Sequence, residues 1–215
     1  MKHFVNNEFS APNVITVPFD PALLEGLRAT IQKPLSKSDY TVVSPPWASD
    51  IKWISPNSIQ SYKFFLAIFE SLGIAQHVKS FVDFDKLIRM YTGFLVVRSQ
   101  CTEANYHVDW RAADNNAFTL ISPLSDNARG FGLLYKTVDG RVAEYDYRVG
   151  EAVIFGDKFL HSTKPGQSEK PVILLSFTFG TDKMAHWPKI WESIGTQSNL
   201  VRLPDGTFLV RDIGD

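Results

Sequence analysis

The part of the chain between about residue 92 and residue 180 is a succession of short apolar segments separated by turn residues. Glycine, aspartate and asparagine lie between the segments, and Asp139-Gly140 joins two extended runs, which is typical of a tight β-hairpin. Strands this short and this regularly interrupted favour a β-sandwich or a jelly roll over a sheet that alternates with helices. The expected strands are residues 93–98, 117–121, 132–136, 142–147, 151–155 and 172–179.

The part before these strands is expected to be richer in helix. Asp20-Pro21 places a capping residue before a proline at the first helical position, which predicts a helix ending near residue 32. Apolar residues recur at helical spacing over residues 58–72, which predicts a second helix. Residues 14–18 are a strand candidate. Residues 34–56 are rich in serine and proline, so we expect a long surface loop there.

The part after the strands is expected to hold a helix over residues 182–194, interrupted near Pro188, and a hairpin over residues 200–210. A length of 215 residues suits one domain with a full core. The expected fold class is mainly β with flanking α-helices, in which N-terminal helices pack on a jelly-roll barrel. Its expected parts are a helical N-terminal support over residues 1–91, a jelly-roll core over residues 92–180, and a C-terminal helix and hairpin over residues 181–215.

Charge and composition argue against several classes of partner. Lys and Arg number 22 against 23 Asp and Glu, so attraction to phosphate does not dominate the surface and nucleic acid is not the expected partner. No apolar run approaches the ~18 residues of a membrane span, and the N-terminal residues turn polar too soon for a signal peptide. The single cysteine, Cys101, excludes an internal disulfide. The chain is expected to be cytoplasmic with no membrane partner, and its oligomeric state stays open.

One stretch of the chain brings two types of metal ligand together. His107 and Asp109 are two residues apart, so in an extended strand both side chains point to the same face. A histidine from another strand would complete a set of two imidazoles and one carboxylate, which leaves three positions open on octahedral iron(II). By itself the His-x-Asp tripeptide is weak evidence, because short motifs recur by chance.

The candidate third ligand is His161. It follows the apolar strand that ends at Phe155, and it lies 54 residues beyond His107. A histidine that only packs in the core does not require this setting after a strand. The sequence therefore predicts His107, Asp109 and His161 as the metal ligands and as the catalytic residues.

The whole of residues 92–180 resembles the double-stranded β-helix of the Fe(II)/2-oxoglutarate dioxygenases, closest to the prolyl-4-hydroxylase-like and phytanoyl-hydroxylase-like branches. Four pieces of sequence, each containing strand residues or ligands, carry the resemblance. They are Phe94–Gln100; His107-Val108-Asp109; Phe118–Asp126 with Gly130-Phe131-Gly132; and Val149–Phe155 with Leu160-His161-Ser162 and Pro165.

The resemblance implies a cupin-like jelly roll and a hydroxylase. Such an enzyme couples the oxidative decarboxylation of 2-oxoglutarate by O2, which releases succinate and CO2, to hydroxylation of a substrate. Fe(II) and 2-oxoglutarate are the implied cofactors, with ascorbate as a candidate reductant. Asp109 argues against halogenation, because chlorinating members of the family carry a small residue in place of the carboxylate. The substrate stays open between a small molecule and a protein side chain.

The far carboxylate of 2-oxoglutarate needs a cation or a hydroxyl in a buried place. The family usually supplies Arg or Lys about ten residues beyond the distal histidine, often with a serine two residues further on. Here Lys170 lies nine residues beyond His161, and Val172 stands where the serine would be. Strand alternation gives Lys170 the same face as Ser176, so it is the first candidate, although a solvated turn lysine is the alternative. The other candidates for this carboxylate are Arg98, Tyr135 and Ser176.

Several residues near the ligands are candidates either for substrate contact or for packing, and two alternatives to the oxygenase stay open. The first is a cupin-type metalloenzyme without 2-oxoglutarate, which needs no cation for a far carboxylate. The second is a non-catalytic jelly-roll binding module that has retained the ligands by accident. The flanking candidates are Asn105, Tyr106, Trp110, Arg111, Asn116 and Thr119.

Overall fold

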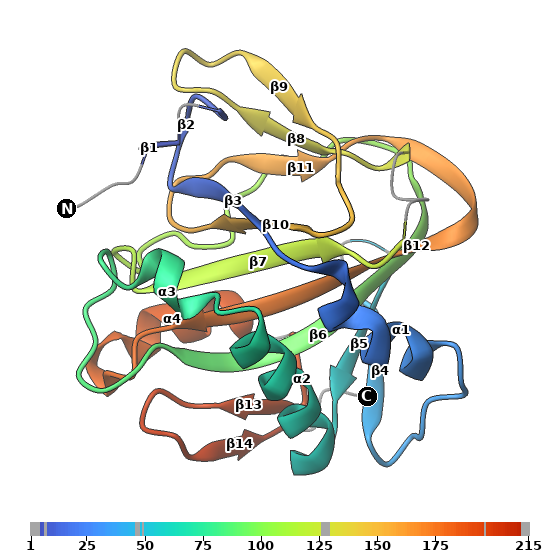
Figure 1. Ribbon diagram of the computed structural model, residues 1–215. Coiled ribbons are helices and arrows are strands. Elements are labelled where there is room, and N and C mark those ends of the chain that lie inside the picture. The colour runs from blue at the N-terminus through green and yellow to red at the C-terminus, as the bar shows by residue number, and fades with distance from the viewer. Residues whose placement is uncertain are drawn as a thin grey trace.

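The computed structural model describes residues 5–6, 8–45, 48, 50–125, 130–195 and 197–211. These residues form two antiparallel sheets with helices packed against the larger one (Figure 1). In spatial order, the larger sheet contains β3 (Val14–Pro18), β10 (Glu151–Phe155), β7 (Ala117–Pro123), β12 (Gly166–Gly180), β6 (Arg89–Cys101), β5 (Ile51–Pro56) and β4 (Tyr40–Val43). The smaller sheet contains β11 (His161–Thr163), β8 (Leu133–Lys136) and β9 (Val142–Tyr145).

The remaining elements are short. The hairpins are β1 (Val5–Asn6) with β2 (Ala11–Pro12), and β13 (Leu200–Arg202) with β14 (Phe208–Val210). The helices are η1 (Pro21–Leu24), α1 (Glu25–Ile31), α2 (Ile59–Ser71), α3 (Ala75–Val78), η3 (Met184–His186) and α4 (Trp187–Ile194). In the part of the chain that the structure describes, no helix combines the length and the apolarity that crossing a bilayer requires.

Helix α2 covers the outer face of the larger sheet. It begins at Ser58 because the Ser58 hydroxyl accepts from the Ser61 backbone N–H at 3.1 Å, while the Ser61 hydroxyl accepts from the Ser58 backbone N–H at 3.2 Å. Its apolar stripe packs on β12, where the ring of Phe69 lies 5.5 Å from that of Phe177. The helices therefore cover one face of the larger sheet, and the other face is the one that lines the cavity described below.

The predicted fold class, mainly β with flanking helices on a jelly roll, is confirmed. The long loop expected over residues 34–56 is wrong in part, because it contains β4 and β5. The serine and proline content predicted a loop, but buried Ile51 and Trp53 lie on either side of exposed Lys52. Both pack in an apolar cluster with Phe94 of β6. Residues 1–91, expected as a helical support, therefore also supply β3, β4 and β5 to the larger sheet.

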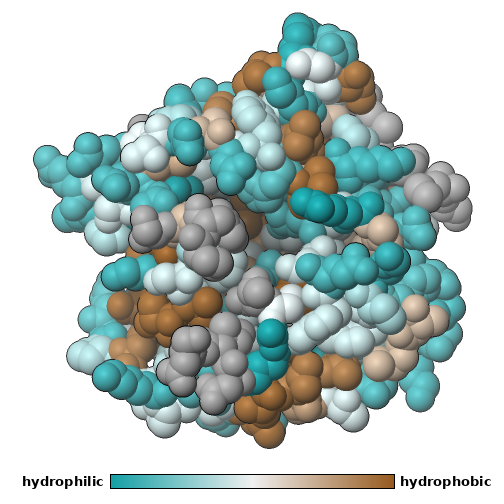
Figure 2. All heavy atoms as spheres, turned by 180° about the vertical axis from the view of Figure 1, so that it is seen from behind, coloured by the Kyte–Doolittle hydropathy of each residue, from teal (hydrophilic) through white to brown (hydrophobic). Residues whose placement is uncertain are grey.

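The structure also shows where Pro188 and Cys101 lie. Pro188 lies in the first turn of α4, where its missing N–H costs nothing, so it begins the helix and does not interrupt it. Cys101 is free and buried at the end of β6. Hydrophilic side chains cover much of the face seen in Figure 2, and that face is hollowed near its centre.

Candidate metal centre and active site

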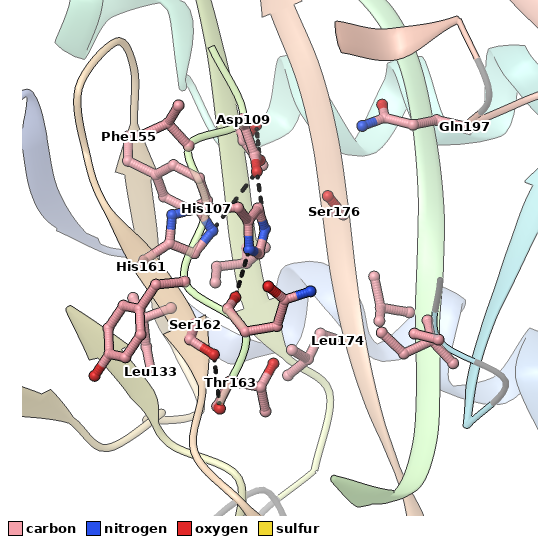
Figure 3. A pocket seen from close by; sticks show the side chains of 18 of the residues that line it. His107, Asp109, Leu133, Phe155, His161, Ser162, Thr163, Leu174, Ser176 and Gln197 are labelled. Carbon is pink, nitrogen blue, oxygen red and sulfur yellow. Dashed lines mark hydrogen bonds and ion pairs between the residues drawn. The ribbon is translucent and has the colours of Figure 1, made fainter. Parts of the chain in front are cut away.

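A cavity of about 810 Å³ is lined by residues of both sheets. The inner face of the larger sheet contributes side chains from β5, β6, β7 and β12, including Leu174 and Ser176 of β12 (Figure 3). The smaller sheet contributes Leu133 and residues 161–163, and the loop over residues 102–112 and helix α4 contribute further side chains. The other lining residues are Ala48, Asp50, Tyr147, Phe155 and Gln197. The cavity is therefore built where the two layers of the jelly roll separate.

His107 and His161 are held side by side by a β-bridge. The backbone N–H of each residue donates to the carbonyl oxygen of the other, both at 2.9 Å, and the ring centroids are 4.6 Å apart. Asp109 follows on the same side, with Oδ1 3.4 Å from His107 Nε2 and 3.6 Å from His161 Nε2 (Figure 3). The extended strand expected around His107 is reduced to this single bridge, yet the two-residue spacing still brings its side chain and that of Asp109 together.

The geometry of the three residues fits one metal ion. One ligand atom from each residue can be chosen so that all three lie within 4.8 Å of one another. Asp109 Oδ1 lies 3.4 and 3.6 Å from the two Nε2 atoms, separations that one ion with bonds of about 2.0 to 2.2 Å can span. His107 Nδ1 lies 2.9 Å from the Asn105 carbonyl oxygen, and His161 Nδ1 lies 3.0 Å from the Phe159 carbonyl oxygen. A carbonyl only accepts, so each Nδ1 carries the proton and each Nε2 is left to bind a metal.

The electrostatics keep Asp109 ionised and His161 neutral, the forms in which these two groups bind metal, whereas they favour the protonated form of His107, whose proton a metal ion must displace. Burial raises the pKa of Asp109, but the hydrogen bond with His107 and the positive charge of both imidazoles outweigh it and bring that pKa to about 2. Burial lowers the pKa of His107, but the contact with Asp109 raises it by more, so the pKa of His107 lies above the ordinary value of 6.5. Burial lowers the pKa of His161, and Asp109 offsets this only in part. One carboxylate and two imidazoles form the donor set expected for non-haem iron(II).

The structure does not bring Lys170 to the cavity. Lys170 is exposed and is not among the residues that line the cavity. The register of β12 against β6 passes from Gln167 opposite Gln100 to Val172 opposite Arg98, which is five steps on β12 for two on β6. This irregularity breaks the alternation from which an inward-facing Lys170 was inferred.

Arg98 and Ser176, two other candidates for binding the far carboxylate of 2-oxoglutarate, do line the cavity. Arg98 has 9% of its side-chain surface exposed and forms an ion pair with Asp50. Tyr135 faces His161 in the ladder between β8 and β11. Its ring nevertheless packs against Phe9, with centroids 5.1 Å apart, and it is not among the lining residues.

Tyr147 is a lining residue that the sequence analysis missed. Its side chain is buried, and its hydroxyl has no hydrogen-bond partner among the described residues. Burial raises the pKa of Tyr147, and the charges of Arg98 and Asp109 both act on it, so the phenol stays protonated between a cation and the ligand cluster. The strand expected over residues 142–147 ends at Tyr145 in the structure, so Tyr147 lies two residues beyond β9, where strand alternation gives its side chain no orientation.

The residues flanking the ligands divide between the cavity and the core. Trp110 is buried in an apolar cluster with Ile190 and Ile194 of α4. Asn116 accepts through its side-chain oxygen from the backbone N–H of Asp83 at 2.9 Å. The flanking candidates that line the cavity are Asn105, Tyr106, Arg111 and Thr119.

Comparison with known proteins gives matches in structure and none in sequence. Neither the protein-family models nor the curated proteins match the chain. The α-ketoglutarate-dependent epimerase SnoN from nogalamycin biosynthesis superposes with a TM-score of 0.60 at 10% identity, covering 79% of both chains. HygX from Streptomyces hygroscopicus, with nickel, 2-oxoglutarate and hygromycin B bound, gives 0.59 at 12% identity, covering 82% of this chain and 88% of HygX. A prolyl-4-hydroxylase from Pseudomonas putida gives 0.50 at 16% identity, covering 79% of this chain and 92% of that one.

Identities this low speak for the fold alone. The solved structures are Fe(II)/2-oxoglutarate oxygenases of the group that the sequence motifs resemble. The chain therefore has the fold that these oxygenases share, and the resemblance inferred from the motifs is confirmed at the level of the fold.

Proposed function

We propose that the chain is an Fe(II)- and 2-oxoglutarate-dependent oxygenase that oxidises a small molecule. The observation that carries the proposal is the convergence of His107 Nε2, His161 Nε2 and Asp109 Oδ1 at the wall of a cavity. These three atoms would hold the iron. Bound iron would supply the site at which 2-oxoglutarate and O2 react, and two neutral imidazoles with one carboxylate leave it enough positive charge to attract the cosubstrate dianion.

Arg98 and Tyr147 are the residues that we assign to the far carboxylate of 2-oxoglutarate. Both side chains are almost fully buried and line the same cavity as the ligand cluster. A buried guanidinium binds a carboxylate through charge-assisted hydrogen bonds, and a protonated phenol adds one more donor. Ser176, buried on β12, could donate a further hydrogen bond.

The substrate that we propose is a small molecule with both apolar and polar groups. A volume of about 810 Å³ is within the range of about 300 to 1,000 Å³ typical of small-molecule sites, and it leaves room beside 2-oxoglutarate. One wall is apolar, where the rings of Trp53 and Phe94 lie 5.9 Å apart. HygX was solved with hygromycin B and SnoN with nogalamycin RO, both small molecules, which supports this choice over a protein side chain. The polar lining residues on the other side include Asn105, Arg111, Lys189, Glu192 and Ser193.

The test is made on the full chain loaded with Fe(II) without oxygen. Addition of 2-oxoglutarate should produce the visible charge-transfer absorption of a chelate, and admission of O2 should then release succinate, with or without ascorbate. The Asp109→Ala and His161→Ala variants should show neither the charge-transfer absorption nor succinate release. Succinate release should rise with hydroxylated ring compounds more than with peptides, and mass spectrometry of the product would distinguish hydroxylation from epimerisation. Iron binding without a 2-oxoglutarate response would favour the cupin-type alternative, and no iron binding would favour the binding module.

A further inference from the structure

A chain of two hydrogen bonds, the first buried and the second partly buried, ends on the carboxylate of Asp109. The indole Nε1–H of Trp110 lies 3.0 Å from the hydroxyl oxygen of Thr119, and that hydroxyl lies 2.7 Å from Asp109 Oδ2. Trp110 is 1% exposed and Thr119 is 4% exposed, so little of either side chain is open to water, although Thr119 lines the cavity. Asp109 Oδ1, the other carboxylate oxygen, is the atom that faces both histidines.

The direction of both bonds follows from the chemistry of the donors. An indole N–H can only donate, so the Thr119 hydroxyl oxygen accepts from Trp110. The single hydroxyl proton of Thr119 is then directed at Asp109, whose ionised carboxylate can only accept. Oδ2 is thus engaged on the side away from the metal cluster, while Oδ1 remains available.

We infer that Thr119, oriented by Trp110, is a positioning residue that restricts Asp109 to binding the metal through Oδ1 alone. The inference rests on the proposed function, because it concerns the metal of that site. With one oxygen from Asp109 and one nitrogen from each histidine, three of six octahedral positions stay open, which is the number that a bidentate cosubstrate and O2 require. A carboxylate free to bind through both oxygens would take one of these positions.

Thr119 and Trp110, the two residues of this hydrogen-bond chain that precede Asp109, are both held by rigid parts of the fold. Thr119 lies in the middle of the sheet, on β7, between Phe155 on β10 and Thr178 on β12. Trp110 is packed in the apolar cluster under α4. Partners of this kind, one bond removed from a metal ligand, typically change metal affinity by about 10- to 100-fold when they are removed.

The experiment compares Co²⁺ binding by the full chain in three variants, without cosubstrate or turnover. Thr119→Val removes the hydroxyl at nearly constant shape, Thr119→Ser retains it, and Trp110→Phe removes the indole N–H together with part of the buried ring. We expect Thr119→Val to raise the Kd for Co²⁺ by about 10- to 100-fold and to alter the visible Co²⁺ spectrum, which reports coordination number. Thr119→Ser should restore most of the affinity and the spectrum, and Trp110→Phe should fall between.

Thr178→Val is the matched control, because Thr178 lies directly opposite Thr119 and is 0% exposed, but its hydroxyl has no hydrogen-bond partner in the described structure. It should bind Co²⁺ like the wild type. Wild-type Kd and spectrum in Thr119→Val, or an equal loss in Thr178→Val, would overturn the inference. If Thr119→Val does not fold, as judged by its thermal unfolding, Trp110→Phe and Thr119→Ser carry the same comparison. Failure of the wild type to bind Co²⁺ would instead count against the proposed function.

Discussion

Arg98 of β6 lies directly opposite Val172 of β12 in the antiparallel ladder between the two strands. Paired residues in such a ladder point their side chains to the same face, so Arg98 reaches the inner side of the sheet at the level where β12 carries an apolar residue. Val172 is 1% exposed and packs in an apolar cluster. A buried cation of the cavity wall is thus supplied by the neighbouring strand, whereas the resemblance to the oxygenases implies a cation on the strand after the distal histidine.

Arg98→Ala should weaken the binding of 2-oxoglutarate to the iron-loaded protein by about 2 to 4 kcal/mol, the usual cost of truncating one partner of a buried charged pair. Tyr147→Phe should cost about 0.5 to 1.5 kcal/mol, because it removes one hydrogen bond. Lys170→Ala and Tyr135→Phe should leave the affinity unchanged, since neither residue lines the cavity. Anaerobic titration with 2-oxoglutarate measures all four.

Asp50 complicates the Arg98 variant, because it forms an ion pair with Arg98 and would be left alone to repel the dianion. The double variant Asp50→Asn/Arg98→Ala removes this repulsion. We expect most of the loss to persist in the double variant. Full recovery there would mean that Arg98 serves only to neutralise Asp50, and a loss confined to Lys170→Ala would restore that residue to the role.

The sequence was sufficient for the parts of the site that depend on local spacing. His107 and Asp109 share a face because they are two residues apart, and this holds even where the strand shrinks to a single bridge. His161 could be placed because it follows a strand with a clear apolar pattern. Their backbone contact to each other could not be predicted, because it depends on how two distant loops meet.

The residues proposed to bind the cosubstrate could not be placed from sequence because their positions depend on register between strands. Strand alternation was extended through β12 to Lys170. The register of β12 is irregular between Gln167 and Val172, however, and no local sequence pattern predicts this. Arg98 gains its position from pairing with Val172, a long-range contact. Strands β4 and β5 were missed for a related reason. Their stability comes from packing Trp53 on Phe94, and the local composition favours a loop.

His161→Ala should abolish metal binding while the chain remains folded. It removes one of three ligands, so the Kd for Fe(II) or Co²⁺ should rise by more than about 100-fold, above the range for outer partners. The metal-free protein should lose about 2 to 4 kcal/mol, since a buried hydrogen bond to the Phe159 carbonyl and the ring contacts with Phe155 and Phe159 disappear. Chemical denaturation in the presence of chelator measures the second quantity. A variant that cannot fold while chelated wild type does would mean that His161 holds the core together.

Metal affinity should fall as the pH is lowered, and His107 should set where the fall begins. Asp109 holds the pKa of His107 above 6.5, so below that raised pKa each ion must displace a proton, and log Kd should rise by about one unit per pH unit. The pKa of His161 is lowered, so that residue stays neutral until the pH is lower still. In the metal-free protein the charge on His107 contributes stability that is fully present below 6.5 and is lost as pH rises through the raised pKa. Calorimetry of Co²⁺ binding in two buffers counts the protons released, and binding that does not change between about pH 5 and pH 8 would contradict the assignment of His107 as a ligand.

Gly180→Ala should destabilise the fold, and Gly26→Ala should stabilise it. A methyl group at Gly180, where β12 ends beside β7, would lie 2.0 Å from the carbonyl oxygen of Asn116 and 2.8 Å from Cα of Ala117. Both contacts are with backbone, so the strands must separate at the start of β7, at a cost of about 1 to 3 kcal/mol. Gly26 lies in α1 with nothing within 4 Å of such a methyl, and alanine there should add about 0.5 to 1 kcal/mol by restricting the unfolded chain. Urea unfolding of the two metal-free variants measures both effects, and a Gly180→Ala variant as stable as Gly26→Ala would show that β12 and β7 do not approach this closely.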